Sequence, residues 1–175
     1  MIVILTGASQ AGKTTVCGDL VERARSRGLS VAGLLTTRRM ASDRIGLDVE
    51  DLSSGERVPL AERDQIGDGP ATEHWAFHRC GIEWAADRLA RAGAADLFIV
   101  DEIGPLELLR GEGWVGAIGA LAEPAHRLAV AVVRPELVPH MLDALGDRPV
   151  RRVEVTLANR DALSSELAAL LTEPR

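Results

Sequence analysis

A glycine-bearing segment near the start of the chain has residue types that hold phosphate groups. Gly7, Gly12, Lys13 and Thr14 satisfy the spacing G-x-x-x-x-G-K-[ST] within GASQAGKT. Glycines let successive backbone N–H groups point into one concave anion site, which a following helix N-terminus reinforces with partial positive charge. Lysine in this position contacts the β- and γ-phosphates, and the threonine hydroxyl is a ligand of Mg²⁺. The segment therefore predicts a triphosphate site with Mg²⁺ as cofactor.

The lysine of this segment is also the only lysine in the sequence. A compact ammonium on a flexible stem enters a narrow phosphate site that a planar guanidinium does not fit, although an arginine-biased composition is an alternative explanation. Another alternative is a plain turn whose lysine and threonine only begin a helix. We assign Lys13 a catalytic role at the phosphates as well. The predicted nucleotide contacts in this segment are Gly7, Ala8, Ser9, Gln10, Ala11, Gly12, Lys13, Thr14 and Thr15.

An acidic pair follows the apolar run Leu97–Val100. Ligands in parallel sheets collect at the carboxyl ends of the strands, so Asp101 is a predicted Mg²⁺ ligand, directly or through water. The adjacent Glu102 is the predicted catalytic residue that orients or deprotonates a water. The alternative is a pair of acidic residues that only starts a solvated loop. Together with the phosphate loop, the pair favours hydrolysis over simple binding.

Arginine is the usual side chain for charge that develops on a transferred phosphoryl group. Arg134 comes directly after the apolar run Leu128–Val133, at the expected ligand-binding end of a strand. We predict a catalytic contact with the γ-phosphate, and Arg110 is a further candidate of the same kind. Pro135 is a natural first residue of a helix, so an exposed loop residue is the alternative for Arg134.

Alternating strand and helix patterns must position these residues. Strands are predicted at Ile2–Thr6, Val31–Thr36, Leu97–Val100, Leu128–Val133 and Val150–Val155. Helices are predicted at Lys13–Arg27, Ile82–Ala92, Trp114–Ala122, Glu136–Leu145 and Arg160–Leu171. Such alternation is typical of a mostly parallel sheet with helices on both faces. We predict an α/β fold, a three-layer P-loop NTPase.

The stretch from Arg44 to Leu60 has a different pattern. Apolar residues alternate with small or charged ones over Arg44–Leu52, a turn follows at Ser53–Gly55, and a second strand is predicted at Arg57–Leu60. Period two on both sides of a turn predicts an antiparallel hairpin appended to the parallel sheet. Ala61–Glu73, which is rich in glycine and proline, is predicted to be a loop.

Length and composition limit the class of protein. A chain of 175 residues fits a single domain over residues 1–175, and 46% hydrophobic with 26% charged residues is ordinary for a globular protein. The net charge of −6 argues against sequence-independent nucleic-acid binding. We expect no membrane span, because no segment approaches ~20 apolar residues. The lack of a basic leader and the presence of only Cys17 and Cys80 predict a cytoplasmic location, and a monomer is compatible with the sequence.

Four phrases resemble the cancer-related nucleoside-triphosphatase family. They are DEIGPLEL from Asp101, GLLT at Gly33, RIGLDVEDLSSGERVPLA from Arg44 and VTLANRD from Val155. The resemblance implies a RecA-like P-loop core and Mg²⁺-dependent hydrolysis of ATP, GTP and other nucleoside triphosphates to diphosphate and phosphate, with loose base selectivity. It also implies that Asn159 contacts the base.

Asn159 is also a good N-cap for the helix that follows it, which is compatible with a base contact. The Asn-Lys-x-Asp phrase of guanine-specific proteins is absent, so we expect poor base discrimination. The chain departs from the family where members carry an acidic residue after the GLLT-like strand, because Thr37, Arg38 and Arg39 stand there. These two arginines either face the phosphates or form a solvated turn.

Three functions share the phosphate loop. The first is a Mg²⁺-dependent nucleoside-triphosphatase in which Glu102 activates water. The second is a kinase that phosphorylates a small molecule or nucleotide, with Ala61–Glu73 as its acceptor site. The third is a nucleotide-dependent adaptor without catalytic activity. Release of phosphate without an added acceptor distinguishes the first from the other two.

Overall fold

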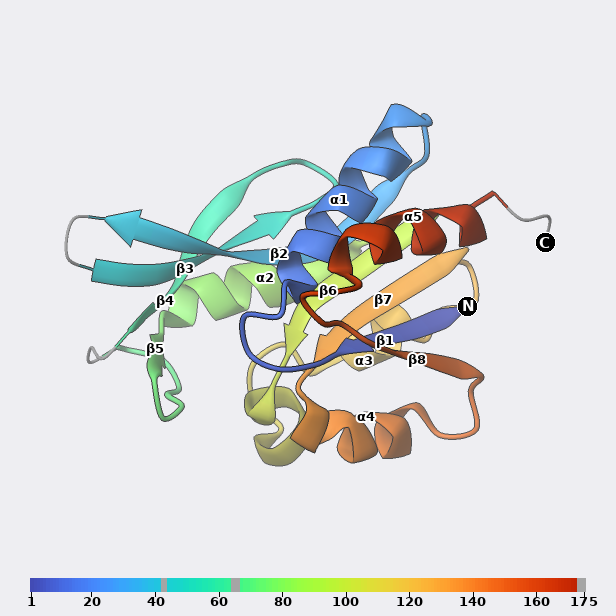
Figure 1. Ribbon diagram of the computed structural model, residues 1–175. Coiled ribbons are helices and arrows are strands. Elements are labelled where there is room, and N and C mark those ends of the chain that lie inside the picture. The colour runs from blue at the N-terminus through green and yellow to red at the C-terminus, as the bar shows by residue number, and fades with distance from the viewer. Residues whose placement is uncertain (42–43, 64–66, 173–175) are drawn as a thin grey trace.

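One twisted sheet of eight strands forms the centre of the molecule. The computed structural model describes residues 1–41, 44–63 and 67–172. The strands are β1 (Ile2–Thr6), β2 (Val31–Ala41), β3 (Arg44–Asp51), β4 (Arg57–Arg63), β5 (Trp75–Phe77), β6 (Leu97–Ile103), β7 (Leu128–Val133) and β8 (Val150–Glu154). They hydrogen-bond in the order β5-β4-β3-β2-β6-β7-β1-β8 (Figure 1).

Five neighbouring strands, β2, β6, β7, β1 and β8, pair in parallel and form the body of the sheet. Every residue of β1 and β7 is buried, because their β-branched and small apolar side chains are covered on both faces. The two strands lie side by side, with Ile2 opposite Ala129 and Leu5 opposite Val132. The predicted parallel sheet is confirmed, and β7 has the predicted bounds.

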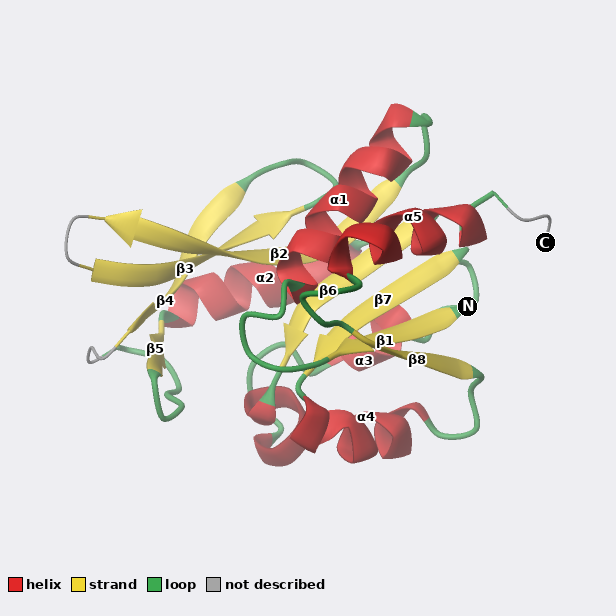
Figure 2. Cartoon of the chain, in the orientation of Figure 1, coloured by secondary structure: helices red, strands yellow, loops and turns green. Residues whose placement is uncertain are grey.

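Helices cover both faces of this sheet (Figure 2). On one face α1 (Lys13–Ser26) and α5 (Arg160–Leu170) pack over apolar side chains such as Leu5 and Val130. On the other, α2 (Arg79–Arg91), α3 (Gly116–Leu121) and α4 (Val138–Leu145) pack over Ile4 and Val100. The predicted three-layer α/β architecture is confirmed. Among the described helices, none combines the length and the apolar character needed to cross a membrane.

The antiparallel extension is larger than the predicted hairpin. β2 continues to Ala41, and its second half pairs with β3 from Leu34↔Asp51 to Ala41↔Arg44. β4 extends to Arg63 because Ala61 and Arg63 pair with Phe77 and Trp75 of β5. The prediction that Ala61–Glu73 is all loop is therefore wrong for Ala61–Arg63, and its residues 64–66 lie outside the described residues. Pairing with β3, the next strand in the chain, lengthens β2, and pairing with β5 lengthens β4.

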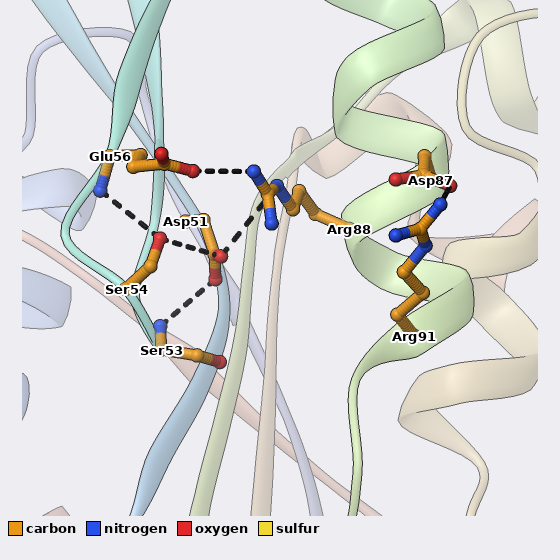
Figure 3. A network of polar contacts seen from close by, with 7 residues as sticks. All are labelled: Asp51, Ser53, Ser54, Glu56, Asp87, Arg88 and Arg91. Atoms are coloured by element: carbon orange, nitrogen blue, oxygen red, sulfur yellow. Dashed lines mark hydrogen bonds and ion pairs between the residues drawn. The ribbon is translucent and has the colours of Figure 1, made fainter.

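A polar network fastens the extension to α2 (Figure 3). In the β3–β4 turn, Asp51 accepts hydrogen bonds from Ser53 N and Ser54 Oγ, both at 2.9 Å. Arg88 of α2 pairs with Glu56 and lies 4.0 Å from Asp51. One guanidinium therefore links the turn to the helix that supports it.

Several helix bounds differ from those predicted. The segment predicted as one helix over Glu136–Leu145 starts as the 3₁₀ turn η2 (Pro135–Leu137) and continues as α4. α3 begins at Gly116 instead of Trp114, and α2 begins at Arg79 instead of Ile82. A π-helical turn, η1 (Leu106–Arg110), was not predicted and follows β6. Capping and turn geometry decide such ends, so periodicity alone places them within a few residues.

His126 is a buried polar residue that ties α3 to the sheet. Its Nδ1 accepts a hydrogen bond from Ala95 N at 3.2 Å, and Nε2 then donates to Ala120 O at 3.1 Å. The ring stacks on Phe98 with centroids 4.3 Å apart. Burial lowers the pKa of His126 below its usual range, although its backbone hydrogen bonds oppose the change. The neutral imidazole is therefore part of the folded state.

We expect the contribution of His126 to stability to decline as pH falls below about 6.5, because the unfolded chain takes up a proton at this residue before the folded form does. The contribution is complete above that pH and is lost as pH falls through the lower pKa of the folded state. Urea unfolding between pH 8 and 5 measures it. Relative to wild type, the free energy of unfolding of His126→Gln is expected to rise as pH falls through this range, whereas the difference between wild type and the exposed His140 replaced by glutamine is expected to stay constant. Equal profiles for the two variants would contradict the prediction.

Candidate active site

The phosphate loop connects the end of β1 to the start of α1. Gly7 has φ +133°, and a Cβ there would lie 2.3 Å from the Val155 carbonyl oxygen, so only glycine fits. Val155 also donates from its backbone N to Thr6 O at 2.7 Å. The segment after β8 therefore packs directly against the first glycine of the loop. Ala8, Ser9 and Gln10 are exposed, so this part of the loop is accessible.

Lys13 folds back over the loop that precedes it. Its Nζ donates hydrogen bonds to Gly7 O and Ala8 O, each at 2.8 Å. The single ammonium of the lysine side chains therefore lies at the mouth of the loop, where the sequence predicts the phosphates. Thr14, the second residue of α1, lies beside Asp101 near the carboxyl end of β6.

Asp101 is almost completely buried, with 2% of its surface exposed. Burial raises the pKa of its carboxyl to about 7; the Glu102 charge adds to this, while the Thr14 hydroxyl and the Lys13 charge oppose it. Among the described residues, its Oδ2 atom has no hydrogen-bond partner. Strand β6 runs through Asp101 and Glu102 to Ile103, so the prediction that they follow the strand is wrong by three residues. Parallel pairing of Asp101 with Leu35 continues the strand despite the charge.

Glu102 and Arg134 meet in space although they come from different strands. Arg134 Nε donates to Glu102 Oε1 at 2.6 Å. Their side chains are 31% and 45% exposed, so both are accessible from solvent. Because β6 and β7 are neighbours, their carboxyl ends carry these two residues to the same place. The structure therefore joins two predicted catalytic residues in one ion pair.

Asn159 holds a loop instead of capping a helix. Its Oδ1 accepts from Thr156 N at 2.8 Å, and its Nδ2 donates to Glu154 O at 2.9 Å. It stands at the N-cap position of α5 but makes no side-chain cap hydrogen bond. The capping prediction is wrong, because the loop after β8 offers the amide closer partners.

The remaining predicted arginines lie in other surroundings. Arg39 pairs with Asp48 at 2.9 Å and with Glu62 at 2.5 Å, within the antiparallel extension. Arg110 donates to Ala71 O at 2.7 Å and pairs with Glu112 at 2.7 Å. Arg38 is exposed on β2. These contacts engage Arg39 and Arg110 away from the phosphate loop.

Two residues near the site were missed by sequence reasoning. Arg160, the first residue of α5, lies over the phosphate loop, because a Cβ on Gly12 would be 2.8 Å from its Cδ. Glu107 accepts hydrogen bonds from Gly104 N and Trp114 N in the segment after β6. The sequence signal for Arg160 was a basic residue at the start of the helix that follows β8, the strand beside β1, and Glu107 had no such signal.

The parallel sheet, with its glycine-lysine loop between β1 and α1, defines a P-loop nucleotide-binding protein. A sequence model of the family described as NTPase matches residues 2–168. The chain is 36% identical over 169 residues to the nucleoside-triphosphatase THEP1 of Methanopyrus kandleri, covering 94% of this chain and 92% of that protein. For THEP1 of Thermofilum pendens the identity is 32% over 168 residues, with the same coverage. The chain belongs to the NTPase family of nucleoside-triphosphatases.

Two solved structures share the fold. The solution structure of a human cancer-related nucleoside triphosphatase matches with a TM-score of 0.75 at 25% identity, covering 99% of this chain and 98% of that one. The crystal structure of THEP1 from the hyperthermophile Aquifex aeolicus matches with a TM-score of 0.73 at 21% identity, covering 99% of this chain and 100% of that one. The predicted family resemblance is confirmed.

Proposed function

We propose that this chain hydrolyses nucleoside 5′-triphosphates, including ATP and GTP, to diphosphate and phosphate in a Mg²⁺-dependent reaction with low base selectivity. The observation that carries the proposal is the end of β6. There Asp101 presents beside Thr14 a buried oxygen that has no hydrogen-bond partner within the described part of the chain, and Glu102 lies next to it within reach of solvent. Hydrolysis requires two groups that nucleotide binding alone does not, which are a ligand for the metal and a base for the attacking water.

The residues present fit a divalent cation. The unpartnered Asp101 oxygen and the Thr14 hydroxyl are hard oxygen ligands of the kind Mg²⁺ takes, with phosphate oxygens and waters completing the set. When bound, Mg²⁺ neutralises charge on the β- and γ-phosphates. Lys13 and the backbone N–H groups of the loop would hold the same phosphates from the other side. Thr14 and Asp101 are therefore the proposed metal ligands.

Glu102 is the proposed base. Its carboxylate accepts a proton from a water as the water oxygen attacks the γ-phosphorus, and the bond from that phosphorus to the bridging oxygen breaks. The electron pair of that bond leaves with the nucleoside diphosphate. Arg134, whose Nε donates to Glu102, would turn its guanidinium toward the γ-phosphoryl oxygens and stabilise the charge that develops on them. The same movement of the Arg134 side chain would then free Glu102 and place positive charge beside the phosphate.

Low base selectivity is supported by the loop after β8. Both the oxygen and the nitrogen of the Asn159 amide already bond within that loop. We propose that Asn159 shapes the surface under the base and adds little discrimination between bases, because selective readout needs donors and acceptors that are left for the ligand.

The test is phosphate release from ATP, GTP, CTP and UTP with Mg²⁺ and without any acceptor. We expect kcat/KM values within about tenfold of one another, and loss of activity with EDTA. Phosphate transfer only to an added acceptor would favour a kinase. Nucleotide binding without turnover under any of these conditions would favour an adaptor, and either result would contradict hydrolysis.

A further inference from the structure

One carboxylate bridges the two ends of the segment between β6 and α3. Glu107 accepts a hydrogen bond from Gly104 N through Oε2 at 2.9 Å and from Trp114 N through Oε1 at 3.2 Å. Gly104 comes two residues after Glu102, and Trp114 is buried against the core with 5% of its surface exposed. The Glu107 side chain therefore ties the end of β6 to a fixed point of the hydrophobic core.

The backbone around Glu107 leaves room for its carboxylate. Gly113 has φ +70°, and a Cβ there would lie 2.0 Å from Glu107 Oε1. Any other residue at this position would both strain the backbone and displace the carboxylate. The glycine next to Trp114 is thus matched to the glutamate six residues earlier.

Backbone hydrogen bonds hold the same segment from inside. Leu108 N donates to Gly104 O at 3.1 Å, and Glu112 N donates to Leu106 O at 2.9 Å, which closes the turn of η1. Leu106 is buried and anchors that turn in the protein interior. The segment has little freedom as long as both bonds to Glu107 are present.

Glu107 is an acid with backbone partners only. Among the described residues, no cation pairs with its carboxylate, which bonds to two backbone N–H groups. Burial raises the pKa of Glu107, its backbone hydrogen bonds lower it, and the nearby Glu102 charge raises it further.

We propose that Glu107 is a positioning residue for hydrolysis, which fixes Gly104 relative to Trp114 and thereby holds Glu102 in its orientation toward the nucleotide. The inference rests on the proposed role of Glu102 as the base. Misplacement of a reacting group by about 1 Å costs on the order of 100-fold in rate. A tie two residues from the base is therefore expected to act on turnover and not on nucleotide affinity.

Glu107→Gln is the direct test. The amide accepts one of the two hydrogen bonds, but its NH₂ group faces the other N–H and opens the tie. We expect kcat to fall about 10- to 100-fold, with the nucleotide Kd changed less than about twofold. The matched control is Glu112→Gln, in the same segment, whose carboxylate pairs with Arg110 and whose loss is expected to leave kcat unchanged. Thermal unfolding verifies that each variant is folded.

Two further measurements separate positioning from general damage. In the Glu102→Gln background, Glu107→Gln is expected to add no further loss of kcat, because its effect passes through Glu102. Amide hydrogen exchange at Gly104 and Trp114 is expected to accelerate in Glu107→Gln. Gly113→Ala, which leaves Glu107 in place but displaces its carboxylate, is expected to reproduce both effects.

The outcomes distinguish the two proposals. If Glu102→Gln slows hydrolysis while Glu107→Gln does not, this inference is wrong and the proposed function stands. Additive losses in the double variant, or unchanged exchange at both amides, also overturn it. A wild-type chain that releases no phosphate overturns the proposed function, and the positioning role with it.

Discussion

Glu102→Gln is expected to lower kcat by about 10²- to 10⁴-fold, the usual contribution of a positioned general base, while nucleotide still binds. Glutamine keeps an oxygen that accepts the hydrogen bond from Arg134 Nε, so the ion-pair geometry changes little. What it removes is the carboxylate that takes a proton from water. Single-turnover phosphate release together with calorimetric binding of ATP in Mg²⁺ measures the two effects separately.

The control for this substitution is Glu136→Gln. Glu136 is an exposed carboxylate in η2, two residues from Arg134. Its replacement by glutamine removes the same amount of negative charge as the replacement of Glu102. We expect wild-type turnover from it. If the two variants hydrolyse at similar rates, Glu102 is not the base and its pairing with Arg134 is only a surface contact.

Asp101→Asn is expected to abolish hydrolysis and, at the same time, to stabilise the nucleotide-free fold relative to wild type as pH rises. Its carboxyl has a pKa of about 7 in the folded protein, so folding keeps the proton that the unfolded chain loses at a lower pH. That stability is complete below the unfolded pKa and is lost as pH rises through 7. From pH 5 to pH 8, the free energy of unfolding of the variant is expected to rise by about 2 to 3 kcal/mol relative to that of wild type.

Urea unfolding without nucleotide or Mg²⁺ over this pH range checks the gain. Asp143→Asn, an exposed carboxylate on α4, is the control and is expected to give a constant difference from wild type. A constant difference for Asp101→Asn as well would mean that the Asp101 carboxyl is not held protonated by burial. An active Asp101→Asn protein would remove it from the proposed metal site.

The fold near the phosphate loop could be predicted because its signals are local. A short β-branched strand, glycines and an amphipathic helix lie within consecutive residues, and the structure places β1 and α1 there. The start of β6 at Leu97 was predicted, but its carboxyl end could not be predicted in the same way. Charged residues usually end a buried strand, but pairing with β2 carries the strand through Asp101, and that pairing joins residues far apart in sequence.

The candidate site was predicted residue by residue, but its contacts were not. Placing Glu102 and Arg134 at strand ends required only the apolar runs before them. Their ion pair depends on β6 and β7 being neighbours, which is a property of the sheet order. Arg160 was missed for a related reason, because a basic residue that begins a helix looks like ordinary surface until β8 is seen beside β1.

The hydrogen bonds of Lys13 also bear on how tightly a nucleotide can bind. The ammonium has two carbonyl acceptors at 2.8 Å within the protein, so a triphosphate that binds there competes with the protein's own oxygens. Binding therefore gains only the difference in free energy between a Lys13 hydrogen bond to phosphate and one to a carbonyl. This difference is smaller than the full strength of a charged hydrogen bond. When the diphosphate leaves, Lys13 re-forms its hydrogen bonds to the Gly7 and Ala8 carbonyls. The same exchange that weakens substrate binding therefore assists release of the product.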